Sequence, residues 1–293
     1  MKKRIGLVAA LILIGLQGRP ASSADKPPAP FGVRVVGTGR PMILIPGLGC
    51  SGDVWKETVD HFKDKFQCHV LTLAGFAGQP PREAPFIEPT KNAIVDYIRE
   101  KRLDRPIIVG HSLGGFMTYL LGMDAPDVVG PLVSVDGLPC LAALVDPNTT
   151  PEQAKKRGDE MSKAIATATR EVYLQRQRGT ISAWISDEAK RDLVLKMGAD
   201  SDQKTFATAM GELFGRDLRG DVAKVKGPFL LIAAPSPFPG MTSEELKKRY
   251  LAQVEKMPNK TVAFAEKSKH FVMYDEPQWM WEQIEKFVQS DRN

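Results

Sequence analysis

The chain has 293 residues, of which 43% are hydrophobic and 26% charged, an ordinary composition for a globular protein with a sizeable core. Its formal net charge of +5 overstates its basic character, because residues 1–24 hold four basic side chains and no acidic one. Without residues 1–24, the chain has 36 of its 40 basic residues and all 35 acidic ones, so its charges nearly balance. We therefore expect no nucleic-acid partner.

The N-terminus has the three parts of a secretory signal peptide. Basic residues Lys2–Arg4 precede a twelve-residue apolar stretch, Ile5–Leu16, and the small residues Ala21–Ala24 suit cleavage before Asp25. Twelve residues are too few for a spanning helix, which needs about 20. We therefore predict removal of residues 1–24, no stable membrane anchor afterwards, and a periplasmic or secreted protein. An uncleaved anchor is the alternative.

The next part of the chain, residues 25–146, alternates apolar runs with helical patterns after a proline-rich lead-in. Buried strands are expected at residues 41–47, 69–75, 105–110 and 130–137, with an edge strand at 31–37. Helical patterns lie between them at residues 51–66, 89–103 and 113–126. This alternation is typical of βαβ units, and it predicts a mainly parallel central sheet flanked by helices.

The alternation stops at residue 147 and resumes at residue 223. Residues 147–222 contain no convincing buried strand but three helical patterns, at residues 151–177, 187–198 and 202–215. Along the first of them a stripe is expected from Met161, Ile165, Ala168 and Val172. We predict an all-helical cap over the open edge of the sheet, after which residues 223–293 complete the core with two more strands and two helices.

The strongest motif is Gly110-His111-Ser112-Leu113-Gly114, which fits G-x-S-x-G between a buried strand and a helix. A strand that turns directly into a helix forces the serine into a strained backbone conformation and projects its hydroxyl from the sheet edge. Glycines on both sides let the crowded turn form. The motif therefore predicts an exposed, nucleophilic Ser112.

With this motif in place, the chain resembles proteins of the α/β-hydrolase fold, from about residue 31 to the C-terminus. In that family the serine of this turn is the nucleophile, which the resemblance assigns to Ser112. The family places its oxyanion loop after the first buried strand, where this chain reads IPGLGCSGDVW. The resemblance implies the backbone N–H groups of Leu48 and Leu113 as oxyanion donors, although Pro46 replaces the histidine that commonly begins the loop.

A serine nucleophile needs a base, and the chain has four histidines. We expect structural roles for His61 and His69, and a side chain that points away from Ser112 for His111. His270 lies after the last predicted strand and before the last helix, where the family keeps its base. The resemblance therefore assigns the base to His270.

The acid that orients the base is missing from its commonest place. The loop after the penultimate strand, residues 227–241, contains no Asp or Glu. The family's alternative is the end of the preceding strand, which here is Asp136, and the order Ser112, Asp136, His270 is that of the fold. Other interpretations stay open, namely an acid supplied by Asp275, Asp200 or Asp202, or an Asp136-Gly137 pair that only makes a turn.

These residues predict a serine hydrolase that cleaves a small, apolar carboxylic ester through an acyl-enzyme, with no cofactor. The alternatives are amide, lactone or carbon–carbon bond cleavage, acyl transfer, or a silent ligand-binding protein. Candidate substrate contacts are Phe76, Phe206 and Met210, with ordinary loop or helix packing as the alternative. The lack of CxxC or HxxxH-type spacing indicates no metal. For Cys50, Cys68 and Cys140 buried free thiols are favoured, with a Cys50–Cys140 disulfide as the alternative.

Overall fold

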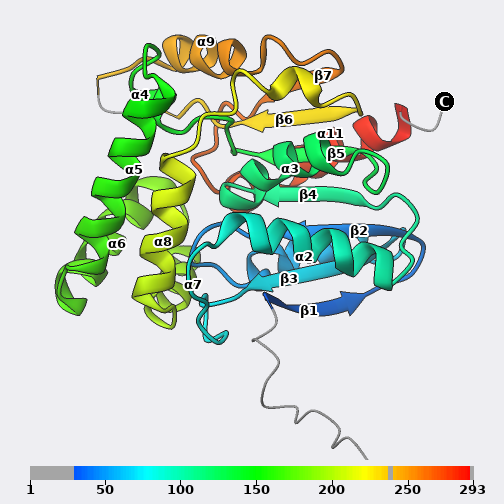
Figure 1. The fold of residues 1–293 in the computed structure, drawn as a ribbon. Helices are drawn as coiled ribbons and strands as arrows, with labels where there is room; N and C mark the ends of the chain where they lie inside the picture. Colours follow the sequence, from blue (N-terminus) through cyan, green and yellow to red (C-terminus); the bar gives the residue numbers. More distant parts are fainter. Residues whose placement is uncertain (1–29, 237–239, 291–293) are drawn as a thin grey trace, which may run out of the picture.

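A computed structural model describes residues 30–236 and 240–290 of the chain. Its centre is a seven-stranded sheet with the order β1-β3-β2-β4-β5-β6-β7 (Figure 1). The strands are β1 (Phe31–Val36), β2 (Arg40–Ile45), β3 (Phe66–Leu73), β4 (Ile107–His111), β5 (Leu132–Val135), β6 (Phe229–Ala233) and β7 (Lys260–Phe264). Only the β1–β3 pair is antiparallel among these strands. The predicted fold class, a mainly parallel sheet with flanking helices, is confirmed.

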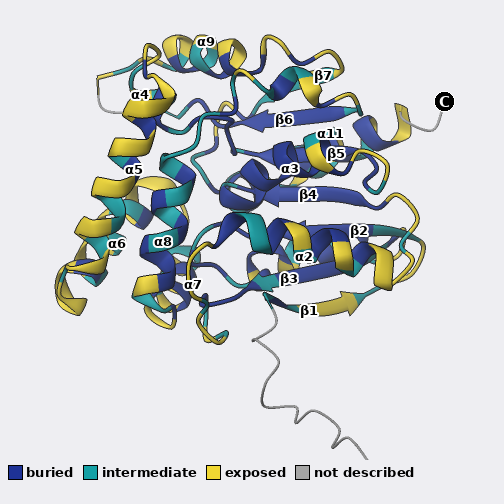
Figure 2. Cartoon of the chain, viewed as in Figure 1, coloured by how far each residue is buried: buried dark blue, intermediate teal, exposed yellow. Residues whose placement is uncertain are grey.

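Burial along the strands follows their place in the sheet. The central strands β4, β5 and β6 are buried along their whole length, because helices cover both faces of a parallel sheet. Strand β1 lies at the edge, as predicted, and Val35 in it is 48% exposed. Figure 2 shows this contrast between the buried centre of the sheet and its exposed edge.

The core helices are α1 (Lys56–Phe62), α2 (Ile87–Glu100), α3 (Leu113–Asp124), α9 (Ser243–Val254), α10 (Val272–Asp275) and α11 (Pro277–Ser290). These helices pack against the sheet in two separate hydrophobic clusters. Ile43 and Ile45 of β2 belong to the cluster that includes α2, α3 and α9, whereas Met42 and Leu44 belong to the cluster that includes α1 and α11. Side chains alternate across a strand, so each cluster fills one face of the sheet.

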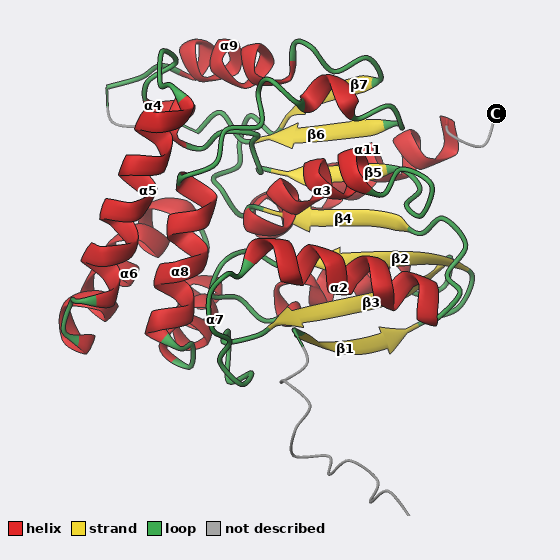
Figure 3. Ribbon diagram, viewed as in Figure 1, coloured by secondary structure: helices red, strands yellow, loops and turns green. Residues whose placement is uncertain are grey.

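The remaining α-helices form a cap at the carboxyl ends of the parallel strands (Figure 3). They are α4 (Ala142–Val145), α5 (Pro151–Ala166), α6 (Arg170–Trp184), α7 (Glu188–Ala199) and α8 (Gln203–Phe214). The all-helical insertion that the sequence predicts is therefore present, with the short α4 just before residue 147. Within residues 30–236 and 240–290, no helix is long and apolar enough to cross a membrane.

The prediction of one helix over residues 151–177 is wrong, because α5 and α6 are separate. The hydroxyl of Thr167 turns back to the carbonyl of Lys163 (2.8 Å), and Thr169 caps α6 by accepting the Val172 N–H. Threonine hydroxyls compete with the backbone in this way. Val172, expected on the buried stripe, is 37% exposed as a result.

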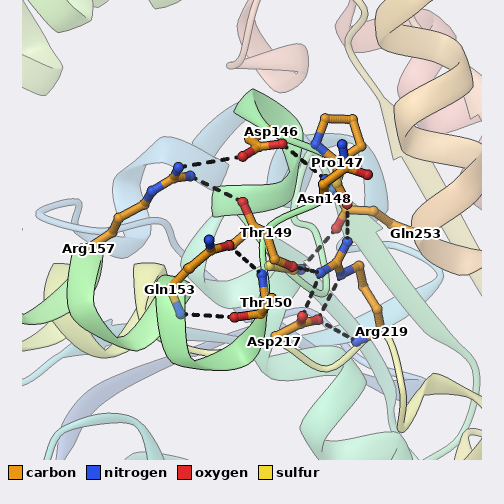
Figure 4. Close-up of polar contacts among 11 residues, drawn as sticks. Asp146, Pro147, Asn148, Thr149, Thr150, Gln153, Arg157, Asp217, Arg219 and Gln253 are labelled. Carbon is orange, nitrogen blue, oxygen red and sulfur yellow. Dashed lines mark hydrogen bonds and ion pairs between the residues drawn. The ribbon is translucent and has the colours of Figure 1, made fainter.

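The two segments that join the cap to the core are tied together by Arg219 (Figure 4). Its guanidinium donates to the carbonyl oxygens of Pro147 (2.8 Å) and Thr149 and pairs with Asp217 (2.7 Å). Burial pushes the pKa of the Asp217 carboxyl upward, but Arg219 holds that pKa below its usual value. The ionised pair therefore fastens the start of the cap to its end.

The three cysteines are all buried and free, as the sequence favours, and the alternative Cys50–Cys140 disulfide is not formed. Burial raises the pKa of Cys50 to about 12 and that of Cys68 to about 11. A protonated thiol is a poor nucleophile, so these groups act as small apolar side chains.

Candidate active site

Ser112 occupies a sharp turn between β4 and α3. Its backbone has φ 53° and ψ −112°, a conformation that costs energy in a residue with a side chain. A Cβ on Gly110 would lie 2.1 Å from the carbonyl oxygen of Gly114, and one on Gly114 would lie 2.3 Å from that of Ile45. Only glycine fits at either position, so the turn that the motif predicts is present for the predicted steric reason.

Ser112 and Asp136 directly follow the neighbouring strands β4 and β5, whose carboxyl ends lie side by side. The register pairs His111 of β4 with Val135 of β5, so the next residue of each strand lies at the same edge of the sheet. The Ser112 N–H donates to the carbonyl of Val135 (2.9 Å), and the Asp136 N–H donates to that of Ile232 in β6 (2.7 Å). Backbone hydrogen bonds thus fix the positions of both residues independently of their side chains.

His270 lies in the loop between β7 and α10 and binds Asp136 directly. Its Nδ1 is 2.6 Å from the Oδ2 of Asp136, and the Asp136 side chain is only 6% exposed. An acceptor on Nδ1 fixes the ring tautomer and leaves Nε2 as the nitrogen that can take a proton. The structure therefore brings together the two residues that the sequence assigns as acid and base.

The other oxygen of Asp136 has two donors that the sequence analysis missed. Oδ1 accepts the backbone N–H of Ala234 (2.9 Å) and the hydroxyl of Tyr250 in α9 (2.6 Å). Tyr250 is buried. It lies 114 residues beyond Asp136 inside a helix with ordinary apolar spacing, so no local pattern marks it.

His111 supports the loop that carries His270 through a hydrogen bond to the backbone of that loop. Its Nε2 is 3.1 Å from the backbone carbonyl of His270, which can only accept, so Nε2 carries the proton. Burial and, to a lesser degree, the neighbouring His270 hold the pKa of His111 well below its usual value. His111 is therefore neutral, and it contacts the backbone of His270 rather than the Ser112 hydroxyl.

The oxyanion loop passes beside the nucleophile turn. A Cβ on Gly47 would lie 2.8 Å from Nδ1 of His111 and 3.3 Å from Cβ of Ser112. Leu113 is the first residue of α3, where N–H groups have no acceptor within the helix. No hydrogen bond within the described part of the chain uses the N–H of Leu48. Both groups that the resemblance implies as oxyanion donors are thus next to Ser112 in the chain or in space.

The alternative acids have other partners. The carboxylate of Asp275 accepts the backbone N–H groups of Ser186 (3.1 Å) and Lys269 (2.8 Å). Asp200 pairs with a surface lysine, and Asp202 caps α8. Of these carboxylates and Asp136, only Asp136 reaches the His270 ring.

The two other histidines have structural contacts, as the sequence predicts. His61 is 3.1 Å from Glu285 in α11, and the ring of His69 lies between Tyr97 (2.7 Å) and Gln67 (3.0 Å). Neither lines the cavity described next.

A cavity of about 890 Å³ lies between the sheet edge and the cap, within the usual range for small-molecule sites. Ser112, Asp136 and His270 all line it, together with Leu48. Among the described residues no hydrogen bond joins Ser112 to His270, and such bonds in free enzymes are often long until substrate binds. The rest of the wall comes mainly from α5, α6 and α8.

Two of the three aromatic and apolar candidates line this cavity. Phe206 and Met210, both on α8, belong to its wall. Phe76 does not: it is fully buried between Phe86, 5.2 Å away, and Phe206, 6.4 Å away. Phe76 therefore packs behind Phe206, and the expectation that it contacts substrate is not supported by its position.

The cap also reaches the proposed base. The ring of Trp184, at the end of α6, lies 4.6 Å from that of His270, and the carbonyl of Trp184 accepts the N–H of Phe271 (3.3 Å). Sequence reasoning missed Trp184 because its partner lies 86 positions away. Within residues 30–236 and 240–290, no group of three or more His, Cys, Asp or Glu side chains is placed to hold a metal ion.

Comparison with known proteins agrees with this fold. A family model described as "Alpha/beta hydrolase family" matches residues 42–283. The chain is 23% identical over 252 residues to the pimeloyl-[acyl-carrier protein] methyl ester esterase of Pectobacterium carotovorum subsp. carotovorum (strain PC1), covering 85% of this chain and 94% of that protein. It is 31% identical over 110 residues to the esterase of the same name from Vibrio cholerae serotype O1, covering 38% of this chain.

The match to the Vibrio cholerae esterase spans only 42% of the length of that relative. Among solved structures, a hydrolase from Pseudomonas aeruginosa PA01 superimposes with a TM-score of 0.75 at 16% identity, covering 88% of this chain and 94% of that one. Identity at that level shows a shared fold.

Proposed function

The chain belongs to the alpha/beta hydrolase family, and on that premise we propose that it is an exported serine hydrolase that cleaves a carboxylic ester through an acyl-enzyme. The observation that carries the proposal is the 2.6 Å contact between Nδ1 of His270 and Asp136, at the sheet edge where the strained Ser112 begins α3. Hydroxyl, imidazole and carboxylate in this order form the catalytic unit of serine hydrolases.

The residues divide the reaction between them. Nε2 of His270 takes the hydroxyl proton while Oγ of Ser112 attacks the ester carbonyl, and Asp136 stabilises the imidazolium that forms. The N–H groups of Leu48 and Leu113 donate to the oxyanion. The alcohol then leaves with the proton from His270. Water, deprotonated by the same nitrogen, attacks the acyl-serine and releases the acid, so no cofactor takes part.

Two observations favour an ester as substrate. Both relatives compared above are named as methyl ester esterases. The cavity wall is rich in apolar side chains from the cap, among them Met161, Phe206 and Met210, which suit the hydrocarbon part of an acyl group or alcohol.

Export rests on the sequence of residues 1–24, which lie outside the described residues. Expression of the full chain in a Gram-negative host, followed by mass spectrometry of the intact protein, tests this part. We expect a mature N-terminus at Asp25 in the periplasmic fraction. A cytoplasmic chain that retains residues 1–24 would contradict export and leave the hydrolase proposal standing.

Labelling with a fluorophosphonate probe tests the reaction. We expect a covalent adduct on Ser112 in the wild-type protein and in Ser236→Ala, which removes another serine that lines the cavity, and none in Ser112→Ala. The same proteins are then assayed with p-nitrophenyl esters of increasing chain length. Turnover by Ser112→Ala at the wild-type rate, or an adduct on a different residue, would overturn the proposal.

A further inference from the structure

We propose that helix α6 forms a second binding subsite in the cavity, which takes a carboxylate that the substrate carries in addition to its scissile ester. The inference deepens the proposed function and rests on it. One face of α6 lines the cavity over almost the whole length of the helix, through Tyr173, Arg176, Gln177, Thr180, Ile181, Ala183 and Trp184. Positions three and four apart share a helix face, so a single wall presents these side chains.

The wall has an apolar end and a polar end. Trp184 contacts the ring of His270 and marks the catalytic end. Arg176 lies eight positions before it, about 12 Å along the helix, and Gln177 and Thr180 lie between. The hydrogen-bonding groups of α6 therefore lie at a distance from the reacting atoms. At that distance they can bind a second group of the substrate.

Tyr173 is the observation that points to a ligand. Tyr173 is 2% exposed and lines the cavity, and its hydroxyl donates to no acceptor within the described residues, while the side chain of Gln177, which also lines the cavity, acts to lower the pKa of its phenol. The ring is held in place by Phe206, 5.5 Å away, and by the guanidinium of Arg170, 5.0 Å from the ring centre. Buried hydroxyls without partners are rare and costly, so a ligand acceptor is the missing partner.

The protonation state of Tyr173 makes it a donor. Burial raises the pKa of its phenol to about 12, so the proton stays on the oxygen throughout the neutral range. A neutral ester oxygen or a carboxylate can accept this bond, and the bond to a charged acceptor is the stronger one.

The charges around the cavity select a carboxylate. Among cavity residues, Arg157 pairs with Asp146 (3.6 Å) and Glu160 faces Lys156 (3.9 Å). Arg176 and Lys269 also line the cavity.

Neither Arg176 nor Lys269 forms a side-chain ion pair or hydrogen bond with a described residue. Asp136, the other cavity carboxylate, is already bound by His270 and Tyr250. The charges left without a partner are therefore positive. Arginine presents a planar set of donors that matches a carboxylate.

The apolar part of the wall completes the substrate class. Ile165, Met210 and Leu213 of α5 and α8 line the same cavity, and they suit a hydrocarbon chain. A hydrocarbon chain with an ester at one end and a carboxylate at the other meets all three requirements: the ester reaches Ser112, the carboxylate reaches Tyr173 and Arg176, and the chain contacts the apolar wall. Half-esters of aliphatic dicarboxylic acids are thus the class that the cavity fits.

Pairs of substrates that differ only in the carboxylate test the inference. Mono-p-nitrophenyl suberate is compared with p-nitrophenyl octanoate, and the adipate half-ester with the hexanoate. For wild type we expect kcat/KM to favour the carboxylate ester at least tenfold in one of the pairs, the scale of a hydrogen bond to a charged group. Arg176→Gln is expected to lower that ratio at least tenfold, and Tyr173→Phe about threefold to tenfold.

Arg178→Gln is the matched control, because Arg178 is an exposed arginine of the same helix that does not line the cavity. It is expected to keep the wild-type ratio. A wild-type ratio at or below one in both pairs, or a ratio that Arg176→Gln and Tyr173→Phe both leave unchanged, would overturn the subsite while ester hydrolysis stands. No turnover of any ester and no fluorophosphonate adduct would overturn the proposed function and the subsite with it.

Discussion

The sheet edge and the cap meet at one cavity but hold their side chains in different ways. At the edge, Ser112 and Asp136 are fixed by backbone hydrogen bonds to β5 and β6, and Gly110 and Gly114 are needed beside Ser112 because a Cβ at either position would clash with the backbone. In the cap, α6 presents polar and apolar side chains to the cavity, on a helix that lies away from the sheet (Figure 1). The sheet edge therefore holds the proposed catalytic residues in fixed positions. Side chains of the cap can be substituted without moving those residues.

The two regions are joined at the histidine loop. Asp275 bridges the backbone of Ser186 in the cap and of Lys269 beside the proposed base, and Trp184 contacts both the ring of His270 and the backbone of Phe271. If the edge performs the chemistry and the cap selects the substrate, the substitutions closest to the Asp136–His270 pair should lower kcat the most.

The largest effect is expected from Asp136→Asn. An amide cannot stabilise the imidazolium and favours the wrong tautomer of His270, so kcat should fall by roughly 10⁴. Steady-state kinetics with a p-nitrophenyl ester measure the loss. Asp200→Asn, at an alternative acid on the surface of the cap, is the control and should keep the wild-type rate. Activity of Asp136→Asn within tenfold of wild type would show that another group orients the base.

Tyr250→Phe removes one donor from Asp136 and keeps the ring. A hydrogen bond to a charged group contributes about 1.5–3 kcal/mol, so we expect kcat to fall roughly tenfold to a hundredfold with little change in KM. Tyr119→Phe is the matched control, because that hydroxyl is also buried but donates to the carbonyl of Gly137 (3.2 Å). Equal losses in both variants would mean that Tyr250 supports the fold rather than the acid.

These two regions also differ in how far the sequence could reveal them. The strand-to-helix motif predicted Ser112, and the family resemblance predicted His270 and Asp136, which follow strands whose carboxyl ends meet at one edge of the parallel sheet. Tyr250 and Trp184 carry no such signal: each touches the site through tertiary contacts of a helix whose own pattern is ordinary. The helix break at Thr167–Thr169 was missed for a related reason, since the apolar stripe continued across a turn that side-chain hydroxyls create.

Asp275→Ala should produce a smaller loss, because it acts through the backbone of the loop. Two N–H groups lose their acceptor, and we expect a threefold to tenfold fall in kcat together with about 1–3 kcal/mol less stability. Urea unfolding and kinetics on the same preparation separate the two effects. Asp192→Ala, at an exposed carboxylate of α7, should change neither. A stability loss with an unchanged kcat would confine Asp275 to holding the cap.

The smallest effect concerns pH and His111. Burial keeps the pKa of this ring well below 6.5 in the folded protein, whereas the unfolded chain titrates near 6.5. Below pH 6.5 the unfolded state therefore binds a proton that the folded state does not, which destabilises the fold as pH falls. Between pH 7.5 and 5.5 this group should remove at most about 1.4 kcal/mol of unfolding free energy.

His111→Gln isolates that contribution, because glutamine cannot take up a proton but keeps an N–H for the carbonyl of His270. All other titrating groups are shared, so the difference between wild type and variant should change by up to about 1.4 kcal/mol between pH 7.5 and 5.5, with the variant gaining at the lower pH. Urea titrations at both pH values measure it. Parallel stability curves would mean that His111 takes up its proton over the same pH range in the folded and the unfolded protein, so that burial does not lower its pKa.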